Sequence, residues 1–142
     1  MTFVKKKINK EPKAPKYSNI NLSLDGYSFA SKFEAAVYQM LKMQVRAGEY
    51  KDLKCQVQVR LGSANILYKP DFSAVRVSTG ETEYFEVKGF KTAIWAIKKR
   101  LWKAEGPGKL HIYEGRHNRF KLVETLEPNN ERCLHCGNTL LD

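Results

Sequence analysis

The chain has 142 residues and carries a formal net charge of +10 at pH 7. This length is sufficient for one folded domain with its own core, and the excess of lysine and arginine favours a polyanionic partner such as nucleic acid. No apolar run approaches the ~20 residues that a membrane-spanning helix needs, and no signal-peptide pattern follows the basic start, so we expect a cytoplasmic protein with no membrane partner.

Residues 1–17 form a basic segment that also contains two prolines. Six lysines stand against one acid within residues 1–16. Such a composition cannot bury enough apolar surface to order a chain, so we expect a disordered arm. Its cations, among them Lys5, Lys6 and Lys7, are predicted to lie along a phosphate backbone, and an arm that crosses to a second protomer is the alternative.

A first helix is predicted from residue 31 to about residue 47, after an extended segment near residues 19–24. Gly48 follows the helix as a stop signal, and Ser31 and Glu34 have the spacing of a capping box. Six apolar residues recur on one arc of this helix. They are Phe33, Ala36, Val37, Met40, Leu41 and Met43.

A β-hairpin is predicted next, after a strand over residues 52–60. Two runs rich in Val, Phe, Tyr and Thr, at residues 66–77 and 82–88, flank the turn signal Ser-Thr-Gly-Glu of residues 78–81. Runs of this composition around a glycine-containing turn are typical of antiparallel strand pairs. The stretch Tyr68-Lys69-Pro70-Asp71-Phe72 lies on the first strand.

The pairing of these two strands brings charged residues together. If Val77 pairs with Thr82, Asp71 lies opposite Lys88, and Glu86 is its diagonal neighbour. Because side chains alternate along a strand, these three charged residues share one face. The other face is the predicted core, formed by Phe72, Ala74, Phe85 and Val87.

Two carboxylates and an ammonium on one face are unfavourable unless something uses them, because the carboxylates repel each other. A hard divalent cation such as Mg²⁺ or Mn²⁺ resolves this conflict with oxygen ligands. The cation would lower the pKa of a bound water, and the lysine would neutralise developing charge on a phosphate. The alternative is that Asp71 is a surface acid near a turn and that Glu86 and Lys88 belong to a solvated strand face.

Pro70-Asp71 followed, after a hairpin turn, by Glu86-Val87-Lys88-Gly89 resembles the PD-(D/E)xK nuclease superfamily, and in particular small phage endonucleases of the endonuclease I type, which resolve Holliday junctions. The resemblance covers roughly residues 28–114. It implies a restriction-endonuclease-like α/β fold, a mixed sheet with flanking helices in the order α-β-β-β-α-β.

The resemblance also implies roles for individual residues. Asp71 and Glu86 would be metal ligands, with the Val87 carbonyl as a candidate third ligand, and Lys88 would be the catalytic lysine. An acid on the first helix commonly joins the metal site in this superfamily, so Glu34 is a further catalytic candidate. The capping box with Ser31 explains Glu34 equally well without catalysis.

A second helix is predicted from Thr92 to about residue 104, with Ile94, Ile97 and Leu101 as its apolar stripe. Trp95 and Trp102 lie seven residues apart on another face. They could stack on nucleic-acid bases, but burial is favoured because large aromatic residues are mostly buried. The lysines of this region are predicted to contact phosphates. They are Lys91, Lys98, Lys99 and Lys103.

Strands at residues 109–114 and 119–124 complete the predicted sheet, the first of them parallel to residues 82–88 through a helical crossover. A nuclease domain is therefore expected over residues 18–126, followed by a tail over residues 127–142.

The tail contains Cys133-x-x-Cys136, which is half of a tetrahedral zinc site. Cys55, His111, His117 or a second chain could complete it for structural Zn²⁺, and two free thiols are the alternative. Three cysteines in all do not make the disulfide framework of a secreted protein.

These observations lead to a metal-dependent DNA endonuclease as the first hypothesis. Its expected substrate is branched or structured DNA in phage replication or recombination, in the host cytoplasm if a phage encodes it. A homodimer would suit paired cuts in a branched substrate. The alternatives are a non-catalytic nucleic-acid-binding module and the cleavage subunit of a restriction, repair or transposition complex.

Overall fold

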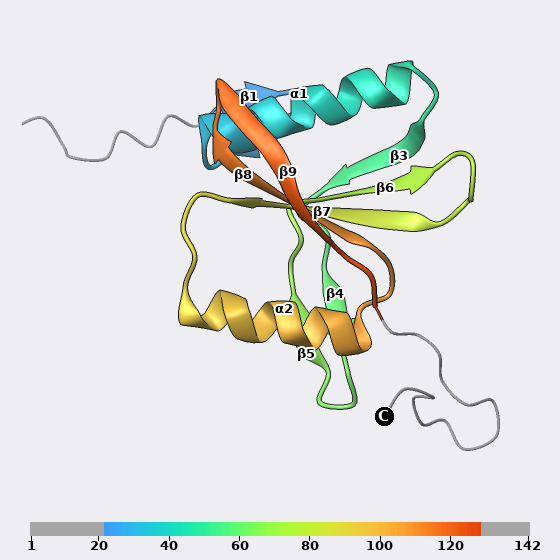
Figure 1. Cartoon of the computed structure of the whole chain (residues 1–142). Coiled ribbons are helices and arrows are strands. Elements are labelled where there is room, and N and C mark those ends of the chain that lie inside the picture. Colours follow the sequence, from blue (N-terminus) through green and yellow to red (C-terminus); the bar gives the residue numbers. More distant parts are fainter. Residues whose placement is uncertain (1–21, 129–142) are drawn as a thin grey trace, which may run out of the picture.

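The protein is built around a five-stranded mixed β-sheet with one helix on each face (Figure 1). The computed structural model describes residues 22–128. The strand order is β3-β6-β7-β8-β9, with β7 and β8 parallel and the other neighbours antiparallel. The strands are β3 (Tyr50–Cys55), β6 (Phe72–Arg76), β7 (Thr82–Lys88), β8 (Leu110–Arg116) and β9 (Arg119–Leu126). The predicted α/β architecture is confirmed.

The helices are α1 (Lys32–Arg46), which precedes β3, and α2 (Ala93–Glu105), which connects β7 to β8. The predicted α-β-β-β-α-β order and the parallel crossover are therefore confirmed for the large sheet. Neither described helix is long and apolar enough to cross a membrane. Two small hairpins complete the structure. They are β1 (Leu22–Leu24) with β2 (Tyr27–Phe29), and β4 (Val59–Leu61) with β5 (Ile66–Tyr68).

Two of the predicted strands are wrong because each is divided between two sheets. The predicted strand 52–60 becomes β3 and β4, and the backbone turns at Gln56, which has a φ of 51°. The predicted strand 66–77 becomes β5 and β6, separated by residues 69–71. Pro70 has no N–H group to donate to a ladder, so the strand ends there. The chain thus leaves the large sheet after Cys55 and returns to it at Phe72.

The first core lies between α1 and the sheet. Phe33, Val37 and Leu41 recur every four residues on α1 and pack with Phe72 and Phe85 from the sheet. The prediction for Met43 is wrong, since its side chain is 69% exposed. The buried arc is centred on Val37 and Leu41, and at 100° per residue Met43 points away from it.

The second core lies between α2 and the opposite face of the sheet. Trp95 and Trp102 are buried there, among apolar residues of the sheet and of the β4–β5 hairpin, so the favoured prediction for the tryptophans is confirmed. The predicted stripe is wrong for Ile94 and Ile97, which are each 65% exposed. Both faces of α2 carry apolar residues, and the face with two indole rings removes more surface from water.

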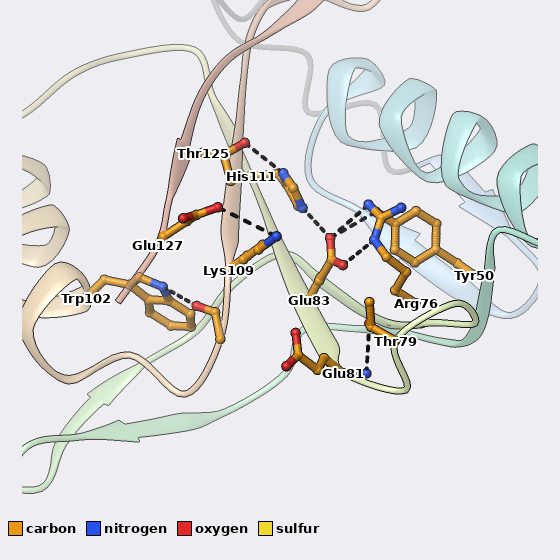
Figure 2. Close-up of polar contacts among 11 residues, drawn as sticks. Tyr50, Arg76, Thr79, Glu81, Glu83, Trp102, Lys109, His111, Thr125 and Glu127 are labelled. Carbon is orange, nitrogen blue, oxygen red and sulfur yellow. Dashed lines mark hydrogen bonds and ion pairs between the residues drawn. The ribbon is translucent and has the colours of Figure 1, made fainter. Parts of the chain in front are cut away.

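A buried charge network holds the end of the sheet where β7 begins (Figure 2). Glu83 is 2% exposed and receives hydrogen bonds from Arg76 and, at 3.1 Å, from the Tyr50 hydroxyl. His111 Nε2 lies 2.6 Å from the same carboxylate, and His111 Nδ1 lies 2.9 Å from the Thr125 hydroxyl. Burial alone would raise the pKa of Glu83, but these hydrogen bonds outweigh it and lower the pKa to about 2.

We expect Glu83→Gln to destabilise the fold by about 2 kcal/mol at pH 7, because it leaves Arg76 without its charged partner. The folded-state pKa lies below the ordinary value of 4.5, so the stabilisation is complete above that pH and is lost as the pH falls toward 2. Urea unfolding at pH 7 and pH 3 measures both effects. Glu81→Gln, at an exposed acid in the adjacent turn, is the control, and an equal loss in both variants would contradict the network's role.

Candidate active site

The pairing of β6 with β7 in the large sheet ends next to Asp71, where the two segments separate. The last pair of the β6–β7 ladder is Phe72 with Phe85, so the predicted pairing of Asp71 with Lys88 is wrong. The observed register differs from the predicted one by two residues, since Val75 and not Val77 pairs with Thr82. A shift of two residues preserves the faces, because side chains alternate with a period of two.

Asp71 is held at this opening by two backbone hydrogen bonds. Its Oδ2 accepts from the N–H of Val87 at 2.7 Å, and its carbonyl accepts from the N–H of Gln56 at 2.8 Å. A strand residue directs its N–H and C=O groups to the same side, so the Val87 carbonyl faces the side of Asp71. The side chain of Asp71 is therefore fixed beside β7 although Asp71 belongs to no strand.

Glu86 and Lys88 lie next to Asp71 on the α2 face of β7. Glu86 is 5% exposed, and its Oε1 lies 2.6 Å from Lys88 Nζ. Its Oε2 accepts a hydrogen bond of 2.9 Å from the Tyr68 hydroxyl. Lys88 Nζ also lies 4.4 Å from the centre of the Trp95 ring, a cation–π contact. Every oxygen of the Glu86 carboxylate thus has a partner within the chain.

Glu34 reaches the same site from the first turn of α1. Its N–H donates to Ser31 Oγ at 3.1 Å, which is the N-cap contact of a capping box, and the backbone of Ala30 lowers the pKa of its carboxyl group. Burial and the charge of Glu86 raise the pKa of Glu34, while Lys88 opposes the shift. The structure therefore confirms the capping contact with Ser31, and the catalytic role of Glu34 stays a prediction.

The charges of these four residues do not cancel, because Asp71, Glu86 and Glu34 are acids and Lys88 alone among the four is basic. Burial, and then the negative charges of Glu86 and Glu34, raise the pKa of Asp71 to about 8, although the Val87 N–H and Lys88 lower it. A carboxyl group with such a pKa keeps its proton at neutral pH unless another cation compensates its charge. This is an electrostatic arrangement that functional sites favour over structural ones.

The donor atoms here are carboxylate oxygens, which suit Mg²⁺ or Mn²⁺. No group of three or more His, Cys, Asp or Glu side chains within residues 22–128 is spaced as a formed metal site. The reason lies in the contacts already made, since Lys88 and Tyr68 occupy Glu86 and the Val87 N–H occupies one oxygen of Asp71. A cation at this site would share or replace the contact between Glu86 and Lys88.

The site is open to ligands through a cavity of about 470 Å³, which we call the first cavity. Asp71 and Glu34 line it together with Tyr27, Cys55 and Gln56. No lysine or arginine is among its lining residues in the part of the chain that the structure describes. The cavity thus gives access to the carboxylates without supplying charge to hold a phosphate.

The predicted phosphate contacts of the α2 region are mostly engaged with acids. Lys99 contacts Glu124, Lys103 Nζ lies 3.7 Å from the same carboxylate, and Lys91 Nζ lies 2.9 Å from Glu114. These are ion pairs near the surface, worth about 0–1 kcal/mol each, so a phosphate could replace them.

Lys98 contacts an aromatic ring instead, since its Nζ lies 5.7 Å from the centre of the Tyr68 ring. Tyr68, which the sequence motif contained but sequence reasoning did not assign, therefore contacts both Lys98 and Glu86. Its position directly before Lys69-Pro70-Asp71 was the available signal, because a buried tyrosine hydroxyl needs a polar partner.

The remaining predicted positions divide between the described residues and the ends of the chain. Lys5, Lys6, Lys7, Cys133 and Cys136 lie outside the described residues. Three of the candidate zinc ligands are described, and their surroundings differ. His117 is exposed at the turn between β8 and β9. Cys55 lines the first cavity, where burial raises the pKa of its thiol to about 11, and His111 is bonded to Glu83 and Thr125.

A comparison with protein families gives a match over most of the chain. A family model described as "Protein of unknown function (DUF1064)" matches residues 14–114. The chain belongs to the DUF1064 family. The matched part of this DUF1064 protein contains Glu34, Asp71, Glu86 and Lys88, and it ends within β8. No curated protein matches the chain.

We expect Asp71→Asn to stabilise this DUF1064 protein in EDTA at pH 8.5, by about 5 °C in melting temperature. The pKa of Asp71 rises from its ordinary value of 3.8 to about 8 on folding, so the stability of the natural protein should fall as the pH rises between these values. The amide oxygen of asparagine keeps the acceptor for Val87. Melting curves at pH 5 and pH 8.5 measure the difference.

The same melting curves with added Mn²⁺ provide the second half of this test. Mn²⁺ should raise the melting temperature of the natural protein and leave that of Asp71→Asn unchanged, because only the carboxylate gains from the cation. Identical pH dependence of the two proteins in EDTA would contradict the raised pKa of Asp71.

Proposed function

We propose that this DUF1064 protein is a metal-dependent DNA endonuclease of the PD-(D/E)xK type, which hydrolyses phosphodiester bonds. One observation carries the proposal. Asp71, Glu86, Lys88 and Glu34 come from three segments of the chain and converge where β6 and β7 separate, with the pKa of Asp71 raised by burial and by its neighbours. Strongly raised carboxyl pKa values with a specific charged neighbour are typical of functional sites.

Asp71, Glu86 and the Val87 carbonyl are the groups that would hold Mg²⁺ or Mn²⁺. When bound, such a cation supplies Lewis acidity toward a phosphate and lowers the pKa of a bound water. Lys88 has a dual task, since it neutralises Glu86 in the free protein and can donate to a phosphate oxygen when substrate is present. The Tyr68 hydroxyl holds the orientation of Glu86, and the Trp95 ring covers one side of Lys88.

The wider biological role follows from the same proposal. Phage replication or recombination, a branched or structured DNA substrate and a location in the host cytoplasm agree with the likeness to phage endonucleases and with the formal charge of +10. A homodimer would present two copies of the site to opposed strands of a branched DNA.

We expect Asp71→Asn and Glu86→Gln to lower Mg²⁺-dependent cleavage of plasmid and branched DNA by at least about 100-fold, because each removes a carboxylate ligand. Lys88→Ala should lower it by a similar factor, because the charge that stabilises the reacting phosphate is removed. DNA binding in EDTA should remain within about threefold, since no phosphate-contacting cation changes in the first two variants. Binding by the natural protein without cleavage under any divalent cation would favour the non-catalytic alternative.

Glu34→Gln separates the two roles of Glu34. We expect it to keep the melting temperature, because glutamine serves in a capping box. Cleavage should fall by at least about tenfold if the negative charge is used in the site. Glu34→Ala, which removes the cap as well, should lower both stability and cleavage. Natural cleavage rates in Glu34→Gln would restrict Glu34 to capping.

A further inference from the structure

A second cavity adjoins the candidate active site on the side of the β8–β9 turn. Its volume is about 480 Å³, and three segments line it: the start of α1, the loop after β7 and the β8–β9 turn. Figure 1 shows these three segments at the same end of the sheet. Glu34 lines both cavities, and Val87 lines the second one, so this groove adjoins the candidate active site at Glu34.

The groove carries positive charge that the first cavity lacks. Lys32, Arg116 and His117 line it and are exposed, and Glu34 is the only acid among its described lining residues. Within residues 22–128, Lys32 and Arg116 form no ion pair, in contrast to Lys91 and Lys99. Two cations that have no acidic partner among the described residues, next to a nuclease-type site, are complementary to the phosphates of a strand.

The turn that presents Arg116 and His117 depends on a glycine. Gly115 has a φ of +137°, and a Cβ at this position would lie 2.3 Å from the Arg119 carbonyl oxygen. Only glycine allows this approach of the two strands. The backbone that carries Arg116 and His117 to the lining of the groove is therefore set by this close approach.

Phe90 gives the groove an aromatic surface. Its side chain is 89% exposed, and it lies in the loop directly after Lys88-Gly89. A ring at this exposure has no packing role in the described fold, and stacking on a nucleobase is what exposed aromatic rings beside cations do in proteins that bind single strands. In a duplex each base is covered by its neighbours, so an unpaired base offers Phe90 a free face that a paired base does not.

We infer that this groove binds a single unpaired strand of DNA, with phosphates on Lys32 and Arg116 and a base stacked on Phe90. The inference rests on the proposed function and specifies its substrate class: DNA in which an unpaired strand leaves a duplex, as at a flap, an overhang or an open branch point. The exposed Ile94 and Ile97 on α2 would extend the apolar surface for a protein partner, but the basic lining of the groove favours DNA.

Binding of the full chain to fluorescent DNA in EDTA tests this inference without cleavage. The probes are a blunt duplex and the same duplex with an overhang of unpaired thymidines, measured by fluorescence anisotropy. The natural protein should bind the overhang duplex more tightly, and Phe90→Ala should weaken that complex about tenfold without affecting the blunt duplex. Met43→Ala, at another exposed apolar residue, on α1, is the matched control.

The cations are tested by Lys32→Ala with Arg116→Ala. The salt dependence is the slope of log K against log salt concentration for binding of the overhang duplex. The double substitution should reduce the magnitude of this slope by roughly 0.7 for each phosphate that is no longer neutralised. Lys51→Ala with Lys54→Ala removes two exposed lysines from the edge strand β3, which line neither cavity, and should leave overhang preference unchanged.

Several outcomes would overturn the inference. Phe90→Ala could bind both probes like the natural protein, or it could lose affinity for both equally. It could also change the oligomeric state in light scattering, and that result would assign Phe90 to a protein interface. Failure of the nuclease proposal is distinguishable. Overhang preference without any cleavage would retain the groove and reject the nuclease, whereas cleavage without overhang preference would do the reverse.

Discussion

The hydrogen bond from the Val87 N–H to Asp71 joins the architecture of the sheet to the chemistry of the site. Beyond the pair of Phe72 with Phe85, β7 has no neighbour on the β6 side, so the N–H of Val87 would remain unpaired. An unpaired and partly buried N–H costs roughly 1–3 kcal/mol. The Asp71 carboxylate removes this cost, and in doing so it is fixed beside Glu86. The interruption of the strand at Pro70 is thus what creates the site.

The protein contains two buried acidic centres on one sheet, and their electrostatics are opposite. At Glu83, hydrogen bonds from Arg76, His111 and Tyr50 outweigh burial and lower the pKa to about 2. At Asp71, burial and neighbouring acids outweigh the donors and raise the pKa to about 8. The first arrangement stabilises the fold, whereas the second destabilises it when ionised. Such a cost persists where a group serves a purpose other than stability.

The sequence predicted that Asp71, Glu86 and Lys88 lie close together, but it predicted the strands that carry them less well. The register was wrong by two residues, yet the assignment of Glu86 and Lys88 to one face and Phe85 to the other survived, because alternation has a period of two. The breaks at Gln56 and Pro70 were missed, since a short apolar run does not show which sheet a strand joins.

Helix α2 was harder to orient, because tryptophans and isoleucines mark two faces, and only packing against the sheet decides between them. Tyr68, Lys32 and Arg116 could not be grouped with the motif, because they come from separate segments that only the tertiary structure brings together.

The positive charge of the chain acts in two ways that composition alone cannot separate. Lys91, Lys99 and Lys103 have acidic partners, and surface pairs of this kind are weak enough for a phosphate to displace. They suit general, salt-dependent attraction of DNA, which depends on charge and not on placement. Lys32 and Arg116 have no acidic partner to lose within residues 22–128, and a helix start and a glycine-dependent turn hold them beside Glu34. In the nuclease that we propose, cations held in this way would position a strand, and that position would determine which phosphodiester bond comes to lie over Asp71 and Glu86.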